Sequence, residues 1–329
     1  MIGRRAVLRV LGAAALIASG SVRAQAPGKT HRIGYLLLTP LVDPPSPERA
    51  AFLAELRRLG YAEGRNLQVE YRSASGNREQ LAALAKELVR EKVEVIVATS
   101  TPAARAASEM TRSIPIVIVG IGNPQRARLV TNFARPEGNV TGVTWLTHEL
   151  VAKRFQLVRE TLPRAKRVAL FWNPDDPTAG EQIAIAREAA GSLRLELNDH
   201  LVAGAEQLQQ ALGRLARERP DALFVIADAR LVTYRKIIAD EALKLRIPCF
   251  SSYRGFVDAG GLMSYAADLA ELYRRGATFV ARLLRGARVV ELPVEQPTRF
   301  QLVLNLKTAR ALGLRIPQSV MVLADEVIE

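Results

Sequence analysis

The chain has 329 residues, of which 49% are hydrophobic and 24% are charged. This composition excludes an intrinsically disordered protein, and the length exceeds what one ordinary hydrophobic core needs. The formal net charge of +13 raises the question of nucleic-acid binding. However, Lys and Arg are spread along the whole chain with acidic residues between them. We therefore expect a solvated, Arg-rich surface and no nucleic-acid partner.

Residues 1–24 have the pattern of a cleaved secretory signal peptide. Three arginines among the first nine residues precede an uncharged apolar run at 10–18, and small residues at positions 22, 24 and 26 offer two cleavage sites. The run is shorter than the roughly 20 residues of a membrane span, which disfavours the alternative of an uncleaved anchor. The Arg4-Arg5 pair leaves a twin-arginine export route open. We expect a periplasmic protein without a lipid anchor, because no Cys lies near the cleavage sites.

After this segment, apolar runs rich in β-branched residues alternate with amphipathic helical patterns. The predicted strands cover residues 32–38, 67–71, 93–98, 116–119, 167–172, 196–201, 222–227 and 247–250. The predicted helices cover residues 48–59, 77–90, 102–111, 179–192, 205–218 and 233–245. Such alternation predicts an α/β fold with parallel sheets. The two similar halves favour two lobes over one very wide sheet.

Signatures of catalysis are missing from the sequence. Gly120-Ile-Gly122 begins like a dinucleotide-binding loop, but Gln125 stands where the third glycine is required. There is neither a phosphate-binding loop nor a Gly-x-Ser-x-Gly elbow. The single cysteine excludes a disulfide within the chain. Three histidines lack the spacing of metal ligands: His31, His148 and His200. We therefore expect no enzyme, no metal and no cofactor.

Polar residues follow the predicted strands, at the ends where open parallel sheets bind ligands. These residues are Thr99, Ser100 and Thr101 after the strand at 93–98, Gly120 and Asn123 after 116–119, Asn173 after 167–172, Asp228 after 222–227, and Ser252 and Tyr253 after 247–250. The turn at 99–101 opens a helix and suits a carboxylate, although N-capping alone explains its hydroxyls equally well. Each position by itself is typical of a turn. Together they predict one ligand-binding cleft, because such strand ends converge.

A connected series of motifs occupies the C-terminal third: GGLMSY at 260–265, LPVEQPT at 292–298, LNLKTA at 304–309 and ADEVI at 324–328. GNVTG at 138–142 and Asn123-Pro124 join the series earlier in the chain. In these motifs the chain resembles the ABC transporter substrate-binding family of the tryptophan/tyrosine-type uptake systems, from about residue 32 to the C-terminus. It departs from that family at Ala266, where relatives commonly carry Gly.

The resemblance implies a type I periplasmic-binding-protein fold, in which three hinge crossings join two Rossmann-like lobes. Here the crossings would lie near Trp145, Tyr265 and Pro297. The first lobe would comprise residues 31–145 and 266–296, and the second lobe residues 146–265 and 297–329.

The resemblance also implies the function of a solute-binding component that delivers a small ligand to an inner-membrane ABC permease with its ATPase. The ligand would be an amino acid or a related small carboxylate, bound by the turn at 99–101 through its carboxylate and by Asp228 through its ammonium. Asn173 and Ser252 would add hydrogen bonds. Three aromatic residues are candidates for stacking on the ligand: Trp145, Tyr253 and Tyr265.

Several of these residues and the function itself have alternative interpretations. Trp145 and Tyr265 would serve equally well as hinge packing, and Asp228 would serve as a helix cap or as a partner of Arg230. A periplasmic sensor that acts on a membrane receptor would have the same fold, and so would an exported enzyme. We expect a monomer. The identity of the ligand is beyond the sequence.

Overall fold

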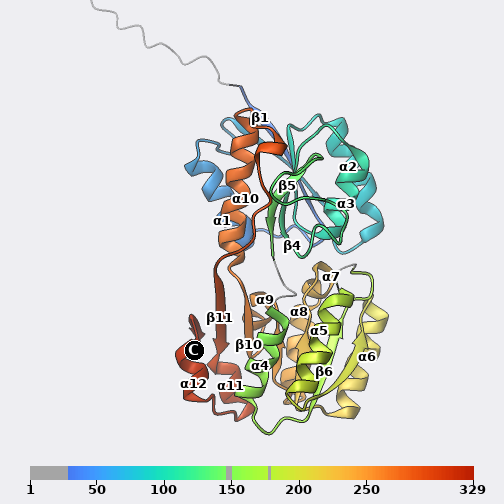
Figure 1. Cartoon of the computed structure of the whole chain (residues 1–329), viewed down its shortest axis with the longest axis vertical. Helices are drawn as coiled ribbons and strands as arrows, with labels where there is room; N and C mark the ends of the chain where they lie inside the picture. Colours follow the sequence, from blue (N-terminus) through green and yellow to red (C-terminus); the bar gives the residue numbers. More distant parts are fainter. Residues whose placement is uncertain (1–28, 146–149, 177–178) are drawn as a thin grey trace, which may run out of the picture.

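The structure is a computed structural model that describes residues 29–145, 150–176 and 179–329. The described helices and strands form two lobes, one above the other in Figure 1, with the C-terminus in the lower lobe. The predicted signal peptide lies outside the described residues. In the part of the chain that is described, no helix has both the length and the apolar character of a membrane span.

The first lobe is built on a five-stranded parallel sheet with the order β2-β1-β3-β4-β5. Its strands are β1 (His31–Leu37), β2 (Leu67–Ser73), β3 (Val95–Ala98), β4 (Ile116–Ile121) and β5 (Val140–Thr144). Helices α1 (Pro47–Arg58) and α10 (Leu269–Leu284) pack against each other on one face. Helices α2 (Leu81–Arg90) and α3 (Thr101–Met110) cover the other face, and a 3-10 turn, Arg78–Gln80, precedes α2.

The sequence explains this packing. All four residues of β3 are apolar and buried, as expected for a strand covered on both faces. Helix α2 buries Leu81, Ala85 and Leu88 on one side, at helical spacing. Gly34 of β1 permits the close approach of this helix, because a Cβ there would lie 2.8 Å from Cδ1 of Leu88.

The second lobe contains a seven-stranded sheet with the order β12-β11-β10-β9-β8-β6-β7. Its strands are β6 (Arg167–Trp172), β7 (Glu196–Leu201), β8 (Ala222–Val225), β9 (Cys249–Ser251), β10 (Met263–Ala267), β11 (Phe300–Asn305) and β12 (Glu326–Ile328). One face packs against α4 (Val151–Thr161), α5 (Ala179–Ser192) and α12 (Gln318–Leu323). The other face packs against α6 (Ala205–Glu218), α7 (Ala229–Thr233), α8 (Arg235–Lys244) and α9 (Arg254–Asp258). Helix α11 (Leu306–Leu312) follows β11, and a 3-10 turn, Val289–Glu291, follows α10.

The chain passes between the two sheets three times. The first passage follows Thr144, the second lies between Ala267 and Leu269, and the third lies between Glu295, which pairs with Val143, and Phe300. These passages agree with the three crossings expected for a type I binding-protein fold. Residues 266 and 267, assigned to the first lobe from the sequence, belong to β10 of the second sheet. The domain bounds as a whole stay a prediction.

The second sheet is not entirely parallel, because β10 and β11 run antiparallel. The topology explains this pair: β10 leads the chain out of the second lobe, and β11 brings it back beside β10 in the opposite direction. A second difference is a short helix, α7, that precedes the predicted helix at 233–245, which itself corresponds to α8. Helix α7 begins at Ala229, where the Asp228 side chain accepts a hydrogen bond from the Leu231 N–H and caps it.

Candidate ligand-binding site

A cavity of about 270 Å³ lies between the two lobes, at the carboxyl ends of strands from both sheets. This volume is close to the lower limit of small-molecule pockets, about 300 Å³, and suits a ligand the size of an amino acid. Eight predicted site residues line the cavity: Thr99, Ser100, Thr101, Gly120, Trp145, Asn173, Asp228 and Tyr253. Residues more than 150 positions apart in the chain therefore meet at one place, as the strand-end pattern predicted.

The turn between β3 and α3 forms one wall of the cavity. Ser100 is buried, and its Oγ accepts a hydrogen bond of 3.3 Å from the Ala103 N–H, so it is the N-cap of α3. Thr99 Oγ1 points back toward the Leu36 carbonyl oxygen, 3.5 Å away. Thr101 is the first helical residue, and its half-buried side chain lines the cavity. N-capping thus explains the hydroxyl of Ser100, whereas Thr101 and the positive end of the α3 dipole face the cavity.

Gly120 shapes the next strand end. It has a φ of 67°, and the pairing of β4 with β5 shifts register between Val119 and Ile121. A bulge of this kind requires the left-handed backbone that glycine adopts at little cost. The bulge brings backbone rather than a side chain to the cavity, which keeps space for a ligand.

Asn173 and Asp228 form a pair on the opposite wall. Asn173 Nδ2 donates to Asp228 Oδ2 at 2.5 Å, and the Leu231 N–H donates to Asp228 Oδ1 at 2.7 Å. Burial raises the pKa of Asp228 to about 6, although both hydrogen bonds work in the opposite direction. Asp228 thus caps α7, which is one of the alternatives considered for it, and it also lines the cavity.

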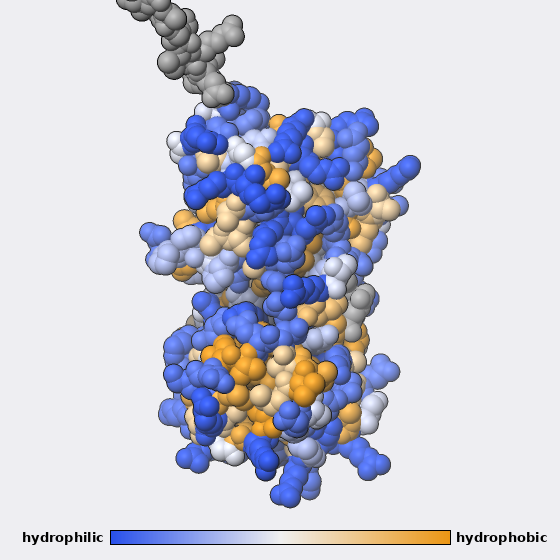
Figure 2. All heavy atoms as spheres, turned by 90° about the vertical axis from the view of Figure 1, so that its left-hand side faces the viewer, coloured by the Kyte–Doolittle hydropathy of each residue, from blue (hydrophilic) through white to orange (hydrophobic). Residues whose placement is uncertain are grey.

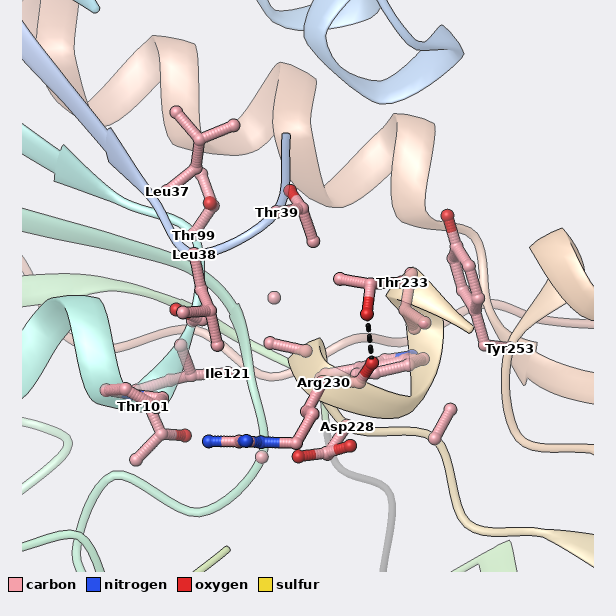
Figure 3. A pocket seen from close by; sticks show the side chains of 18 of the residues that line it. Leu37, Leu38, Thr39, Thr99, Thr101, Ile121, Asp228, Arg230, Thr233 and Tyr253 are labelled. Carbon is pink, nitrogen blue, oxygen red and sulfur yellow. Dashed lines mark hydrogen bonds between the residues drawn. The ribbon is translucent and has the colours of Figure 1, made fainter. Parts of the chain in front are cut away.

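Arg230 is a cavity residue that the sequence reasoning considered only as a partner of Asp228. Its closest acidic contact is instead Asp175, with Nη2 3.9 Å from Oδ2. In Figure 3 the guanidinium extends toward Thr101, while the Asp228 carboxylate lies near the stem of the Arg230 side chain. The cavity therefore has a cation and an anion side by side. Opposite charges two residues apart at a strand end, as in Asp228 and Arg230, are the sequence pattern that could have predicted this pair.

Aromatic side chains lie at the end of the cavity near the first crossing. The Trp145 and Tyr253 rings meet edge to face with their centroids 6.0 Å apart. The Tyr253 hydroxyl donates to Glu48 Oε1 at 3.1 Å, which joins the second lobe to α1 of the first. Glu48 and Tyr273 line the cavity but were missed from the sequence. Neither follows a strand directly, because they belong to the helices α1 and α10.

Three predicted site residues are not among those that line this cavity: Asn123, Ser252 and Tyr265. Asn123 Oδ1 accepts from the Gln125 and Arg126 N–H groups, both at 3.1 Å, and so stabilises its own turn. Ser252 is fully buried, and its Oγ accepts from the Ala227 N–H at 2.9 Å, so it supports the end of β8.

Tyr265 instead borders a much smaller cavity inside the second lobe. Its carbonyl oxygen accepts from Nε of Arg154 at 2.7 Å, and its ring is tilted against Phe300. This is the hinge-packing alternative named above. Asn123, Ser252 and Tyr265 therefore have no place in the wall of the cavity between the lobes.

Among the described residues, no three His, Cys, Asp or Glu side chains are arranged to hold a metal ion. His31 lies beside Glu94, with 3.2 Å between Nδ1 and Oε1, and His200 is buried with its ring edge to face against Phe171. His148 lies outside the described residues. Cys249 is a buried free thiol, and burial raises its pKa to about 12.

Comparison with known proteins decides the family. The sequence profile described as "ABC transporter substrate binding protein" matches residues 45–328, which is most of the chain. The chain belongs to the ABC transporter substrate-binding protein family. This family consists of transport components rather than enzymes, and the resemblance stated from the motifs is therefore confirmed.

Several relatives of this substrate-binding protein are informative. A protein of Clostridioides difficile (strain R20291) named "Tyrosine-binding protein" is 26% identical over 280 residues, covering 84% of this chain and 80% of that protein. A crystal structure of a conserved domain protein from Vibrio cholerae has a TM-score of 0.84 and 27% identity, covering 91% of this chain and 100% of that chain. A Streptococcus pneumoniae domain in complex with L-Trp has a TM-score of 0.82 and 22% identity, with the same coverage, and shows the shared two-lobed fold.

Proposed function

We propose that this substrate-binding protein captures an aromatic amino acid in the periplasm and delivers it to the permease of its ABC transporter. The observation that carries this proposal is the pair of opposite charges at one end of the cavity. Asp228 and Arg230 stand two residues apart at the start of one helix and both line the cavity. An α-amino acid carries an ammonium and a carboxylate on the same carbon atom. Asp228 and Arg230 match the ammonium and the carboxylate of such a ligand, and this match supports an amino-acid ligand.

In this proposal the ligand carboxylate lies between Arg230 and the N-terminus of α3, where the Thr101 side chain and the positive end of the helix dipole face it. The ligand ammonium binds Asp228, which Asn173 holds in place. Gly120 leaves room at the wall, and Thr99 and Ser100 support the turn. The ligand therefore contacts both lobes, and each contact of this kind stabilises the closed arrangement.

The side chain of the ligand would lie among aromatic residues. Trp145, Tyr253 and Tyr273 line the cavity together with apolar groups such as Ile121. Aromatic rings pack favourably edge to face or offset against one another. The names of two relatives point the same way, since one is called a tyrosine-binding protein and another was solved with L-Trp.

Contacts between the lobes support closure as part of the function. Arg78 Nη1 donates to the Asp175 carbonyl oxygen at 3.2 Å, and Arg126 pairs with Glu181 at 2.7 Å. Each contact joins a residue of the first lobe to one of the second. A ligand that binds between the lobes shifts the population toward this closed state only as far as it prefers that state.

Isothermal titration calorimetry of the chain without residues 1–24 tests the proposal. We expect saturable binding of L-tyrosine or L-tryptophan, and weak or undetectable binding of the same compounds as amides or as N-acetyl derivatives. These analogues lose one charge each but keep the ring. Equal affinity for the charged and blocked forms would show that the Asp228–Arg230 end does not bind a zwitterion. A thermal-shift screen of amino acids and small carboxylates identifies the preferred ligand, since a ligand of the native state raises its Tm.

A further inference from the structure

The end of the cavity near the first crossing holds a carboxylate among tyrosine hydroxyls. Glu48 lies in the first turn of α1, is half-buried and lines the cavity. Its Oε1 accepts the hydrogen bond from Tyr253 across the cleft. Tyr273 also lines the cavity, and its hydroxyl interacts with the side chains of Thr99 and Tyr35. We call Glu48, Tyr253, Tyr273 and Tyr35 the distal cluster.

The phenols of the distal cluster stay protonated. Burial raises the pKa of Tyr253, Tyr273 and Tyr35 well above the ordinary value. The carboxylate of Glu48 is therefore the strong acceptor of the cluster. Its two oxygens offer about four lone-pair sites, so Glu48 accepts a second donor while it keeps the hydrogen bond from Tyr253.

The Glu48–Tyr253 part of the distal cluster lies apart from Thr101 and the Arg230 guanidinium. In Figure 3, Tyr253 lies on one side, and Thr101 with the Arg230 guanidinium lies on the other. An amino acid whose ammonium and carboxylate bind Asp228, Arg230 and Thr101 must direct its side chain away from them. In a cavity of about 270 Å³, that direction leads a six-membered or indole ring toward Glu48.

We propose that Glu48 selects among aromatic amino acids by accepting a hydrogen bond from a donor on the ring, so that the site prefers a phenol O–H or an indole N–H over the plain ring of phenylalanine. This inference rests on the proposed amino-acid function. The physical reason is that a bond to a charged acceptor in a shielded site is strong, and a ring without a donor desolvates the carboxylate without replacing its water. Sites built to bind a substrate hydroxyl reject the analogue that lacks it for this reason.

Calorimetry with two ligands of nearly equal size tests this inference. L-Tyrosine carries the donor, whereas 4-methyl-L-phenylalanine replaces the hydroxyl with a methyl group. We expect the wild-type chain to bind L-tyrosine about tenfold or more tightly than the methyl analogue. In Glu48→Ala we expect the ratio to fall to within about threefold. The matched control is Glu55→Ala on the same helix, which does not line the cavity and should keep the wild-type ratio.

The outcomes separate selection from a purely structural role of Glu48. If Glu48 only joins the lobes through Tyr253, then Glu48→Ala and Tyr253→Phe will weaken both ligands by the same factor and keep their ratio, which overturns the inference. A wild-type ratio near one overturns it as well, while binding of either ligand leaves the amino-acid function intact. If none of L-tyrosine, L-tryptophan and 4-methyl-L-phenylalanine binds, the proposed function fails and the inference fails with it. Equal unfolding temperatures of the variants exclude a loss of fold.

Discussion

Asp228→Asn is the substitution that examines the charged end of the cavity most directly. Asparagine has the shape of aspartate and is an equally good N-cap, so α7 keeps its start at Ala229. The amide oxygen can keep one of the two hydrogen bonds that Asp228 accepts, such as the capping bond from the Leu231 N–H, and the other is lost because the amide nitrogen does not accept. The substitution therefore removes the negative charge while it leaves the fold in place.

The expected effect on binding follows from the strength of charged hydrogen bonds. A hydrogen bond to a charged group contributes about 1.5–3 kcal/mol, which corresponds to a loss of affinity of roughly 10- to 150-fold for a ligand with an ammonium. Asp175→Asn is the matched control, because its side chain is 47% exposed at the rim of the same cavity. Solvent screening limits the contribution of an exposed charge, so we expect a change of less than about fivefold there.

The raised pKa of Asp228 adds a pH dependence with a definite sign. A carboxyl group with a pKa of about 6 is ionised at pH 7 and mostly protonated at pH 5. Because only the ionised form attracts an ammonium, affinity should fall as the pH decreases through 6, by about tenfold between pH 7 and pH 5. Asp228→Asn should remove most of this dependence.

Calorimetry with L-tyrosine or L-tryptophan at both pH values measures all of these quantities. The reasoning is refuted if Asp228→Asn binds as tightly as the wild type at pH 7. It is also refuted if the variant retains the full pH dependence, since another group would then bind the ammonium. Unfolding monitored by circular dichroism establishes that the variant is folded.

Three further predictions concern the frame of the site. Gly142→Ala should destabilise the protein by more than about 3 kcal/mol in a urea titration, because φ is 131° and a Cβ would lie 2.1 Å from a carbonyl oxygen of β4. The control Gly138→Ala should be nearly neutral, because a Cβ at that position meets open space. Thr101→Val should weaken a carboxylate ligand by about tenfold in calorimetry, and an unchanged Kd would place the carboxylate elsewhere. Glu181→Gln, which removes the ion pair between half-buried Glu181 and exposed Arg126, should lower affinity by less than about fivefold and enlarge the ligand-free radius of gyration in X-ray scattering. An unchanged radius would argue against a role in closure.

Much of the fold could be predicted from the sequence because its signals are local. The apolar run of β3 and the amphipathic spacing of α2 are visible in a window of ten residues. Several strand and helix bounds differ from the prediction by a residue or two, as frayed ends usually do. The short helix α7 was absent from the predicted helices, because five residues are too few to show hydrophobic periodicity, although its cap at Asp228 was among the alternatives.

The candidate site was predicted only in the part that follows strands. Thr101, Asn173 and Asp228 lie at the cavity because the carboxyl ends of parallel strands meet along one edge. The same rule included Asn123 and Ser252, whose side chains bond to nearby backbone instead. A strand end determines where a residue is, but not the direction in which its side chain points.

By itself, the sequence determined the family, the α/β class and the strand ends that carry polar groups, since each of these is written in short motifs or in local periodicity. The tertiary structure alone decided that Arg230 faces the cavity beside Asp228, and that Glu48 of α1 meets Tyr253 from across the cleft. Glu48 and Tyr253 are 205 positions apart in the chain. Such a contact exists only after two lobes have folded and closed on each other, and no local pattern encodes it.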